Sequence, residues 1–327
     1  MNKIFRRHWL QAALLGASLT LMGAAIAQSY PSKPIRLIVP FTPGGVTDTS
    51  GRLIAEQLSK RLGQQVIVDN KPGASGIIGT QQVAAAEADG YTLLLGFDGT
   101  LVINPHVFPK IGFDSVKDFA PIGKIGDAVL ILVANPSFPA KNLKDLIALS
   151  KTQAGGLSYG TSGTGGTPHI AGELLRQRTG ANLVHVPYKG GGQALTDVLG
   201  GNIPLVYTAI AGAIPHVKSG KLLPIAVSSS KRASSMPDVA TFIENGVTDF
   251  EASSWVGLLA PAKTPRAIVA RLTAELTAIL NDPEVKERLN GMGITATPGT
   301  AESFGAEISR DLAKYGPVVK AAGIKAE

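Results

Sequence analysis

The chain has 327 residues, with 31 Lys and Arg against 24 Asp and Glu, a formal charge of +7 and no cysteine. The lack of cysteine excludes thiol catalysis and cysteine-ligated zinc or iron–sulfur sites. The charge excess is mild and no basic run carries interleaved aromatic residues, which argues against nucleic-acid binding. The length suggests one large or two medium domains.

The first 27 residues have the three parts of a secretory signal peptide. A positive head spans Lys3–Arg7, a mostly apolar stretch follows over Trp9–Ile26, and Ala25-Ile26-Ala27 fits a peptidase site. We therefore predict cleavage after Ala27 and export from the cytoplasm. An uncleaved membrane anchor is the alternative, but the apolar stretch is short for the roughly 20 residues of a span. Removal of the three positive residues leaves the exported chain at about +4.

Strands and helices alternate from there to about residue 95. Apolar residues at helical spacing predict a helix over Asp48–Leu62 with Asp48 as its N-cap. A Gly-rich turn, Asn70–Gly76, leads into a second helix that ends near Ala86. Short apolar runs predict strands at Ile35–Val39, Gln65–Val68 and Tyr91–Leu95. This order predicts a mainly parallel sheet with helices on both faces.

A second α/β unit begins near residue 129. The strands expected in this unit are Val129–Ala134, Leu157–Gly160, Val184–Val186, Leu205–Tyr207 and Leu222–Val227. One more strand, Phe250–Ala260, is expected after them. The expected helices are Leu143–Lys151, Pro168–Arg178, Gly192–Leu199, Ala209–Lys218, Pro265–Leu280, Pro283–Asn290 and Ala301–Ala321. We predict two α/β lobes, residues 28–128 with 253–327 and residues 129–252, each a mainly parallel sheet flanked by helices.

Gly-rich turns after strands are the strongest binding-site candidates. Ligands of open α/β sheets lie beyond the carboxyl ends of the strands, where helix N-termini offer free N–H groups to a carboxylate or phosphate. Two such turns, Phe41–Thr47 and Gly160–Thr167, fall in different lobes, which favours a ligand in the cleft between them. The alternative is that these turns only connect strands to helices.

Enzyme motifs are absent. The nucleophile-elbow pattern that begins at Gly160 ends in Thr164 where a glycine is required, and no phosphate-binding P-loop occurs. Four scattered histidines lack metal-site spacing. We therefore predict no enzyme, no metal and no cofactor, with a hydrolase as a remote alternative. Because no nucleophile–base pair is assembled by spacing, catalysis lacks a candidate residue.

Three single residues have two readings each. His169, in the first turn of a helix after a Gly-rich turn, either reaches a cleft ligand or faces solvent. Lys189 either attracts an anion or is merely solvated on its glycine turn. Asp98, after a strand, either accepts a hydrogen bond from a ligand or shapes its own turn.

Five segments in order resemble the Bug family of periplasmic solute-binding proteins, the receptors of tripartite tricarboxylate transporters. The segments that carry the resemblance are Val39–Asp48, Val68–Gly76, Tyr159–His169, His185–Gly190 and Pro215–Lys221. The resemblance extends from about Tyr30 to the C-terminus. It implies a two-lobed periplasmic-binding-protein fold of type II-like character with the ligand in the interlobe cleft, bound mostly through backbone and hydroxyl hydrogen bonds.

The resemblance also implies a function and a site. It suggests a monomeric receptor that captures a small carboxylate and delivers it to the membrane components of a tripartite tricarboxylate-type transporter. A ligand-loaded sensor for a two-component signalling partner, such as a sensor kinase, is the alternative. By position in the motifs, with Thr208 added for the departure described next, the expected ligand-binding residues are Phe41, Thr42, Gly44, Gly45, Val46, Thr47, Ser75, Phe97, Asp98, Thr161, Ser162, Gly163, His169, Tyr188 and Thr208.

One departure from the family bears on specificity. Many members carry an acidic residue where this chain has Tyr207-Thr208-Ala209. A threonine hydroxyl cannot neutralise a ligand ammonium group. We therefore predict that the protein prefers a carboxylate without an amino group to an amino acid.

Overall fold

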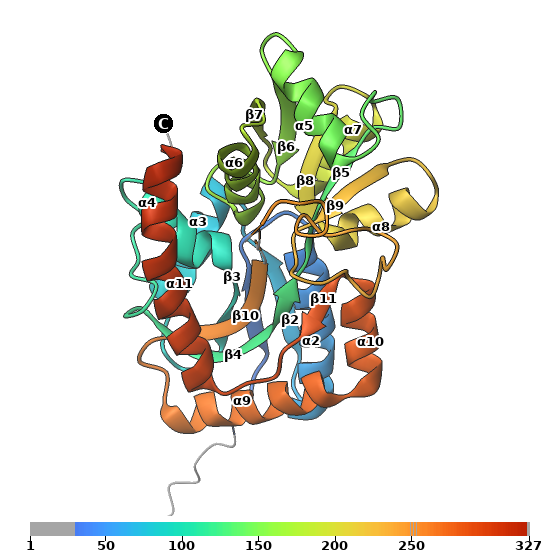
Figure 1. Ribbon diagram of the computed structural model, residues 1–327. Helices are drawn as coiled ribbons and strands as arrows, with labels where there is room; N and C mark the ends of the chain where they lie inside the picture. Colours follow the sequence, from blue (N-terminus) through green and yellow to red (C-terminus); the bar gives the residue numbers. More distant parts are fainter. Residues whose placement is uncertain (1–29, 249, 251, 253, 326–327) are drawn as a thin grey trace, which may run out of the picture. The chain divides into compact units, whose positions relative to one another are not determined.

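The computed structural model describes residues 30–248, 250, 252 and 254–325. The predicted signal peptide, Met1–Ala27, lies outside the described residues. The chain divides into a short unit, Met1–Ser32, and a large unit, Lys33–Glu327. All helices and strands below belong to the large unit (Figure 1).

A six-stranded sheet forms the first lobe, in the order β11-β4-β10-β3-β1-β2. Its strands are β1 (Ile35–Val39), β2 (Val66–Asn70), β3 (Thr92–Phe97), β4 (Phe119–Ala128), β10 (Ser254–Pro261) and β11 (Ile294–Ala296). β1 pairs in parallel with β2 and β3, whereas β10 is antiparallel to both β3 and β4. The sheet is mixed, which corrects the expectation of a mainly parallel one, because the strand that leaves the lobe and the strand that returns to it run side by side in opposite directions.

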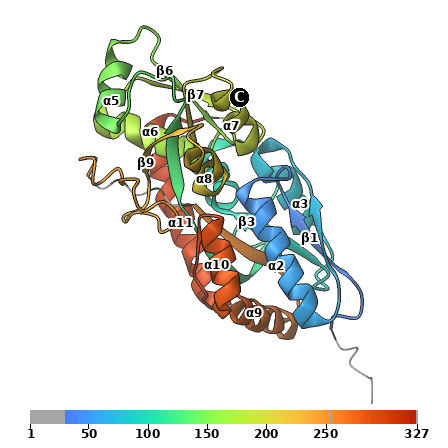
Figure 2. The same ribbon diagram turned by 90° about the vertical axis from the view of Figure 1, so that its right-hand side faces the viewer.

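Helices cover both faces of this sheet. They are α2 (Val46–Leu62), the short helix η2 (Ala74–Gly76), α3 (Ile77–Ala84), η3 (Gly99–Ile103), α4 (Asn104–Val107), α9 (Arg266–Asn281), α10 (Pro283–Gly291) and α11 (Ala301–Ala322). Figure 1 shows α11, α3 and α4 on one side and α2 and α10 on the other, and Figure 2 shows α2, α9 and α10 side by side. Side chains alternate between the two faces of each strand. Those that point toward α11, among them Ile38, Leu94 and Trp255, fill the core beneath this helix.

The second lobe is built on a five-stranded sheet in the order β7-β6-β8-β5-β9. Its elements are β5 (Leu130–Ala134), α5 (Leu143–Thr152), β6 (Leu157–Thr161), α6 (Thr167–Thr179), β7 (Leu183–Pro187), α7 (Gly191–Leu199), β8 (Leu205–Ala209), α8 (Ile210–Lys218) and β9 (Leu223–Val227). This sheet is also mixed, since β5 is antiparallel to β8 and β9. The apolar run of β5 contributes to a core on each face of the sheet, which is why all five of its residues are buried.

The two sheets confirm the predicted two-lobed α/β fold, and the first passage of the chain between them is short. Val129 alone separates β4 from β5. Its N–H donates to the Gly293 carbonyl at 3.1 Å and its carbonyl accepts from the Ile210 N–H at 2.9 Å. The exact domain boundaries, 128/129 and 252/253, stay a prediction.

Several details differ from the sequence-based expectation. α2 begins at Val46 and its N-cap is Gly45, so the prediction of Asp48 as the N-cap was wrong. β4, β11, η3 and α4 were not predicted. β4 reads as a loop because it contains one proline and two glycines, and β11 has three residues.

Candidate functional site

A cavity of about 570 Å³ lies where the loop after β1 faces the starts of α7 and α8. The first lobe contributes the loop, and the second lobe contributes the two helix starts. Nine of the fifteen predicted ligand-binding residues line this cavity, namely Phe41, Thr42, Gly44, Gly45, Val46, Thr47, Phe97, Ser162 and Thr208. The structure therefore brings most of the predicted site together. We call this space the inner cavity.

Three helices begin at the inner cavity, and glycine or alanine stands at each N-cap. The N-cap residues are Gly45 for α2, Gly190 for α7 and Ala209 for α8. In the described residues, none of the three has a side chain that accepts a hydrogen bond from the first N–H groups of its helix. A serine, threonine or aspartate at such a position would satisfy the first N–H groups. Within the described part of the chain, the N–H groups of Val46, Gly191 and Gly192 have no acceptor. The helix starts thus offer free donors and the positive ends of helix dipoles to an anion.

The charge and shape of the inner cavity suit a carboxylate with an apolar body. Among the described residues that line it, Lys189 is the single charged side chain. The walls are largely apolar, and the Phe41 and Phe97 rings meet edge to face with centroids 5.3 Å apart. Thr208, 6 % exposed, adds a hydroxyl near the start of α8.

A glycine at position 190 favours close approach of the lobes at this cavity. Gly190 lies so near Thr42 that a Cβ added to it would be 2.9 Å from the Thr42 hydroxyl oxygen. A larger residue at position 190 would displace the Thr42 side chain or push the two loops apart. The glycine run Gly190–Gly192 therefore both exposes N–H groups and permits the loops to meet.

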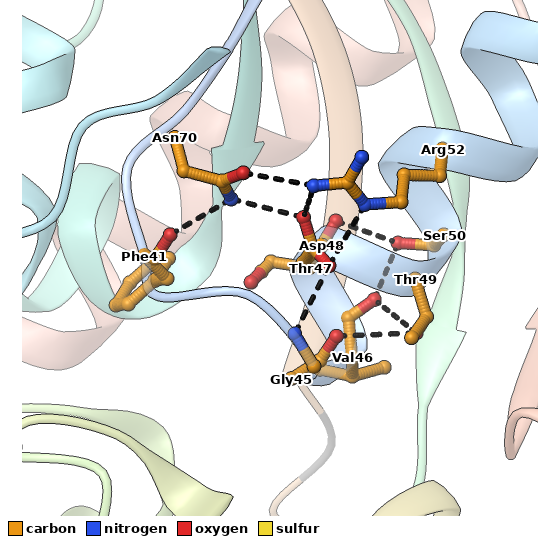
Figure 3. A network of polar contacts seen from close by, with 10 residues as sticks. Phe41, Gly45, Val46, Thr47, Asp48, Thr49, Ser50, Arg52 and Asn70 are labelled. Carbon is orange, nitrogen blue, oxygen red and sulfur yellow. Dashed lines mark hydrogen bonds and ion pairs between the residues drawn. The ribbon is translucent and has the colours of Figure 1, made fainter. Parts of the chain in front are cut away.

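A polar network fixes the loop after β1 (Figure 3). The Asp48 carboxylate accepts from the Gly44 N–H at 3.0 Å, from Asn70 at 2.9 Å and from Arg52 at 2.9 Å. Asn70 also donates to the Phe41 carbonyl at 3.0 Å. Burial opposes ionisation of Asp48, but these hydrogen bonds outweigh it and lower the pKa of Asp48 below its usual value. Asp48 thus holds the loop without presenting a free charge to the cavity.

Sequence reasoning missed Asn70 and Arg52, because they are separated in the chain by 18 residues and lie on different elements, Arg52 on α2 and Asn70 at the end of β2. It also missed Gly191, Gly192 and Ser254 as cavity residues. The glycine run after Tyr188 was a signal for the first two. No sequence signal marks Ser254, which begins the strand that returns to the first lobe.

A second, larger cavity of about 1060 Å³ adjoins the first and shares Phe41, Thr42, Ser162 and Lys189 with it. We call it the outer cavity. Four further predicted site residues line it, namely Ser75, Gly163, His169 and Tyr188. The Ser75 hydroxyl donates to the Thr164 carbonyl at 3.1 Å, and the Tyr188 hydroxyl donates to Asp197 at 2.7 Å. Both hydroxyls are therefore occupied by the protein itself.

His169 lies in the wall of the outer cavity and is stacked on His185, with ring centroids 3.6 Å apart. Its Nδ1 accepts from the Gly165 N–H at 3.1 Å, which leaves the ring proton on Nε2. Burial lowers the pKa of His169 to about 4, and burial together with the neighbouring ring lowers that of His185 to about 3. The pair is neutral near pH 7 and supplies a flat, uncharged surface.

The two remaining predicted site residues, Asp98 and Thr161, are fully buried and are not part of either cavity's described lining. The Thr161 hydroxyl lies 3.0 Å from the Gly163 carbonyl and 2.6 Å from His185 Nε2. Asp98 accepts from Thr167 and Ser254. Their ligand-binding role stays a prediction, although three of their hydrogen-bond partners, Gly163, His185 and Ser254, line the cavities.

Neither a metal cluster nor a membrane-spanning helix is found in the described structure. Over residues 30–248, 250, 252 and 254–325, no three His, Asp or Glu side chains are placed to hold a metal ion. In the same residues, no helix is long and apolar enough to cross a membrane.

Comparison with known proteins identifies the family. The sequence pattern of the tripartite tricarboxylate transporter family receptor matches residues 51–324. The chain belongs to this family. It is 35 % identical to BugT of Bordetella pertussis over 317 residues, which cover 96 % of this chain and 97 % of BugT. The predicted membership of the Bug family is confirmed.

Solved structures confirm the periplasmic-binding-protein fold. The periplasmic binding protein BugD is 35 % identical and superimposes with a TM-score of 0.86, covering 91 % of this chain and 100 % of BugD. Rpa4515 of R. palustris, solved with adipate, is 33 % identical with a TM-score of 0.88, covering 90 % of this chain and 99 % of that one. Members of this family are periplasmic solute-binding receptors and not enzymes, in agreement with the prediction from the absent catalytic motifs.

Proposed function

We propose that the protein binds a small carboxylate in the inner cavity and delivers it to the membrane components of a tripartite tricarboxylate-type transporter. One observation carries the proposal. Three helix N-termini without side-chain caps and one lysine surround a cavity whose described lining contains no acidic side chain. Such a site stabilises negative charge and leaves apolar walls for the rest of the ligand. Adipate, the ligand of the Rpa4515 structure, has this chemistry.

The same lining supports a preference within the carboxylates. An amino acid brings an ammonium group that needs an anionic or carbonyl acceptor when it is buried. Thr208 provides a hydroxyl at the place where many family members have an acid, and Lys189 repels a cation. The proposed ligand is therefore a di-, tri- or aromatic carboxylate without an amino group.

A ligand panel tests this proposal. The exported chain is screened by thermal shift and calorimetry against adipate, succinate, citrate, benzoate, glutamate and aspartate. A true ligand at about a hundred times its dissociation constant stabilises the fold by roughly 2.7 kcal/mol. Tight binding of glutamate or aspartate, without binding of the plain carboxylates, would overturn the ligand assignment.

Delivery needs its own experiment. We expect that proteoliposomes containing the membrane components of a tripartite tricarboxylate-type transporter take up the carboxylate only when the loaded receptor is added. Binding without receptor-dependent uptake would retain the ligand and reject the transport role. Light scattering after gel filtration, with an expected monomer mass, checks the proposed monomeric state.

A further inference from the structure

Asp98 joins three segments that are distant in the sequence. Its side chain is fully buried at the end of β3. One carboxyl oxygen accepts from the Thr167 hydroxyl at 2.5 Å, and the other accepts from the Ser254 hydroxyl. Thr167 is the first residue of α6 in the second lobe, whereas Ser254 begins β10, where the chain re-enters the first lobe. One carboxyl group therefore connects the two lobes and the returning strand.

The contact surface around Asp98 is tight and largely apolar. Ile170 of α6 packs into the core of the first lobe together with Leu101, Val107 and Ile324. A Cβ added to Gly99 would be 3.3 Å from the Cα of Gly166, so the two backbones nearly touch. α6 thus lies with one face against the first lobe, and Asp98 is the acidic group within this contact.

Asp98 is also next to the inner cavity without lining it. Phe97, its neighbour in the chain, and Ser254, its hydrogen-bond donor, both line the cavity. On the other side, Pro168 follows Thr167 directly and lines the same cavity. Phe97, Ser254 and Pro168 therefore connect Asp98 to the wall of the inner cavity.

We propose that Asp98 is a positioning residue for ligand binding, which fastens α6 to the first lobe when the lobes are closed and releases it when they part. The inference rests on the proposed function, in which ligand binding favours the closed form. It assigns to Asp98 a hold on Thr167 and Ser254 in place of a contact with the ligand.

The surroundings of Asp98 make closure depend on pH. Burial raises the pKa of Asp98 to about 7, with Asp311 of α11 adding to the rise and the hydroxyls of Ser254 and Thr167 opposing it. The described residues of β3, η3 and β10 carry no titratable side chain. On α6, His169 is neutral in this range and Glu173 is paired with Arg176, and on β4 Asp127 is paired with Lys124.

The direction of the effect follows from the two forms. When the lobes part, water reaches Asp98 and its pKa returns toward the ordinary value of 3.8. The closed form then binds a proton more tightly than the open form. Closure is favoured as the pH falls below about 7, by up to tenfold per pH unit, and this gain is lost as the pH rises through the closed-form pKa.

A distance measurement without ligand tests the inference. The chain has no cysteine, so Lys110→Cys in the first lobe and Gln177→Cys on α6, both exposed positions, place two unique spin labels. In the doubly labelled protein we expect more of the short-distance form at pH 5.5 than at pH 8. Asp98→Asn, which keeps the size but does not titrate, is expected to abolish the pH difference. A pH-independent distance distribution in the unsubstituted protein would overturn the inference.

Two further variants keep the test decisive if Asp98→Asn fails to fold. Thr167→Val is nearly isosteric and removes the link to α6, so we expect a larger open fraction at every pH. Ser115→Ala removes a buried hydroxyl that bonds the Leu101 carbonyl within the first lobe, and we expect no change. Equal effects of both substitutions would reduce Asp98 to an ordinary structural residue.

Calorimetry with adipate, in buffers of different ionisation enthalpy at pH 7, measures the proton taken up on binding. Uptake of a fraction of a proton that disappears in Asp98→Asn supports the inference, and its persistence in that variant contradicts it. If no carboxylate of the panel binds, the proposed function fails while the ligand-free distances still decide the role of Asp98.

Discussion

Replacing Val46 by proline removes one donor from the inner cavity while keeping α2 intact. Val46 is the first helical residue, a position where proline is favoured because its N–H has no partner within the helix. The preceding residue, Gly45, is extended with φ −79° and ψ 171°, which is the conformation that a following proline requires. The bond from the Thr49 N–H to the Gly45 carbonyl is untouched. We therefore expect Val46→Pro to fold with an unchanged melting temperature.

The expected loss of binding free energy is that of one hydrogen bond from the Val46 N–H to the bound carboxylate. A hydrogen bond to a charged group contributes about 1.5–3 kcal/mol. Since 1.4 kcal/mol is tenfold, the dissociation constant for adipate should rise roughly 10- to 150-fold. The matched control is Val46→Ala, which trims the same side chain but keeps the N–H, so it measures the apolar contribution alone.

Calorimetry at fixed ionic strength compares the two variants. We expect Val46→Pro to bind at least tenfold more weakly than Val46→Ala. If both bind adipate within about threefold of each other, the N–H groups of α2 do not hold the ligand, and the assignment of the inner cavity as an anion site loses its main support.

Three other predictions concern specificity, pH and the core. Thr208→Asp places a carboxylate in the wall of the inner cavity. For two like charges about 6 Å apart at an effective dielectric constant of 20, the repulsion is roughly 3 kcal/mol. Calorimetry should therefore show adipate binding weakened about 100-fold and glutamate binding gained, while Thr208→Asn loses far less. Asp48→Asn should lower the urea midpoint of unfolding at pH 7, and this difference should shrink as the pH falls below about 4. The reason is that a carboxylate with a lowered pKa stabilises the fold only while it is ionised in the folded state. A constant difference down to pH 2 would contradict this. Phe242→Ala should cost about 3–5 kcal/mol in urea unfolding, because the ring is fully buried against Phe250 with centroids 4.2 Å apart, whereas Ile243→Ala, 38 % exposed, should stay within about 0.5 kcal/mol.

Local patterns predicted the regular elements well. The apolar run Ile35–Val39 is β1 residue for residue, and Leu143–Lys151 is α5 without its last residue. In both segments, the residues that are buried in the fold are also the ones that local propensity and periodicity favour, so the local sequence pattern and the tertiary packing agree. The alternation of strands and helices was therefore enough to predict two α/β lobes.

Non-local pairing was the part that the sequence did not reveal. β4 contains Pro121 and Gly126, which locally favour a loop. In the fold, Pro121 pairs with Leu259, and Gly126 is required because a Cβ there would lie 2.4 Å from the Thr295 carbonyl oxygen. These partners are far away in the chain, so the mixed character of the first sheet could not be predicted from local patterns.

The same limit applies to the site. The Gly-rich turns marked the inner cavity because free N–H groups and small residues are local properties of the sequence. The environment of Asp98 is not local, since Thr167 and Ser254 lie 69 and 156 residues away. The sequence predicted Asp98 near a ligand because it follows a strand. Its burial depends on the packing of the second lobe against the first, which local patterns do not predict.

Asp48 and Asp98, which are chain neighbours of residues that line the inner cavity, point to one principle of its construction. Asp48 is neutralised by Arg52 and by donors from Gly44 and Asn70, and Asp98 is buried between two hydroxyls. Each carboxyl group fixes a loop or helix that shapes the cavity, yet neither is part of the described lining, so neither repels an anionic ligand at close range. An anion receptor needs rigid loops as much as it needs positive potential. Here the carboxyl groups of Asp48 and Asp98 hold the loops from outside the cavity lining, and the backbone N–H groups face the cavity.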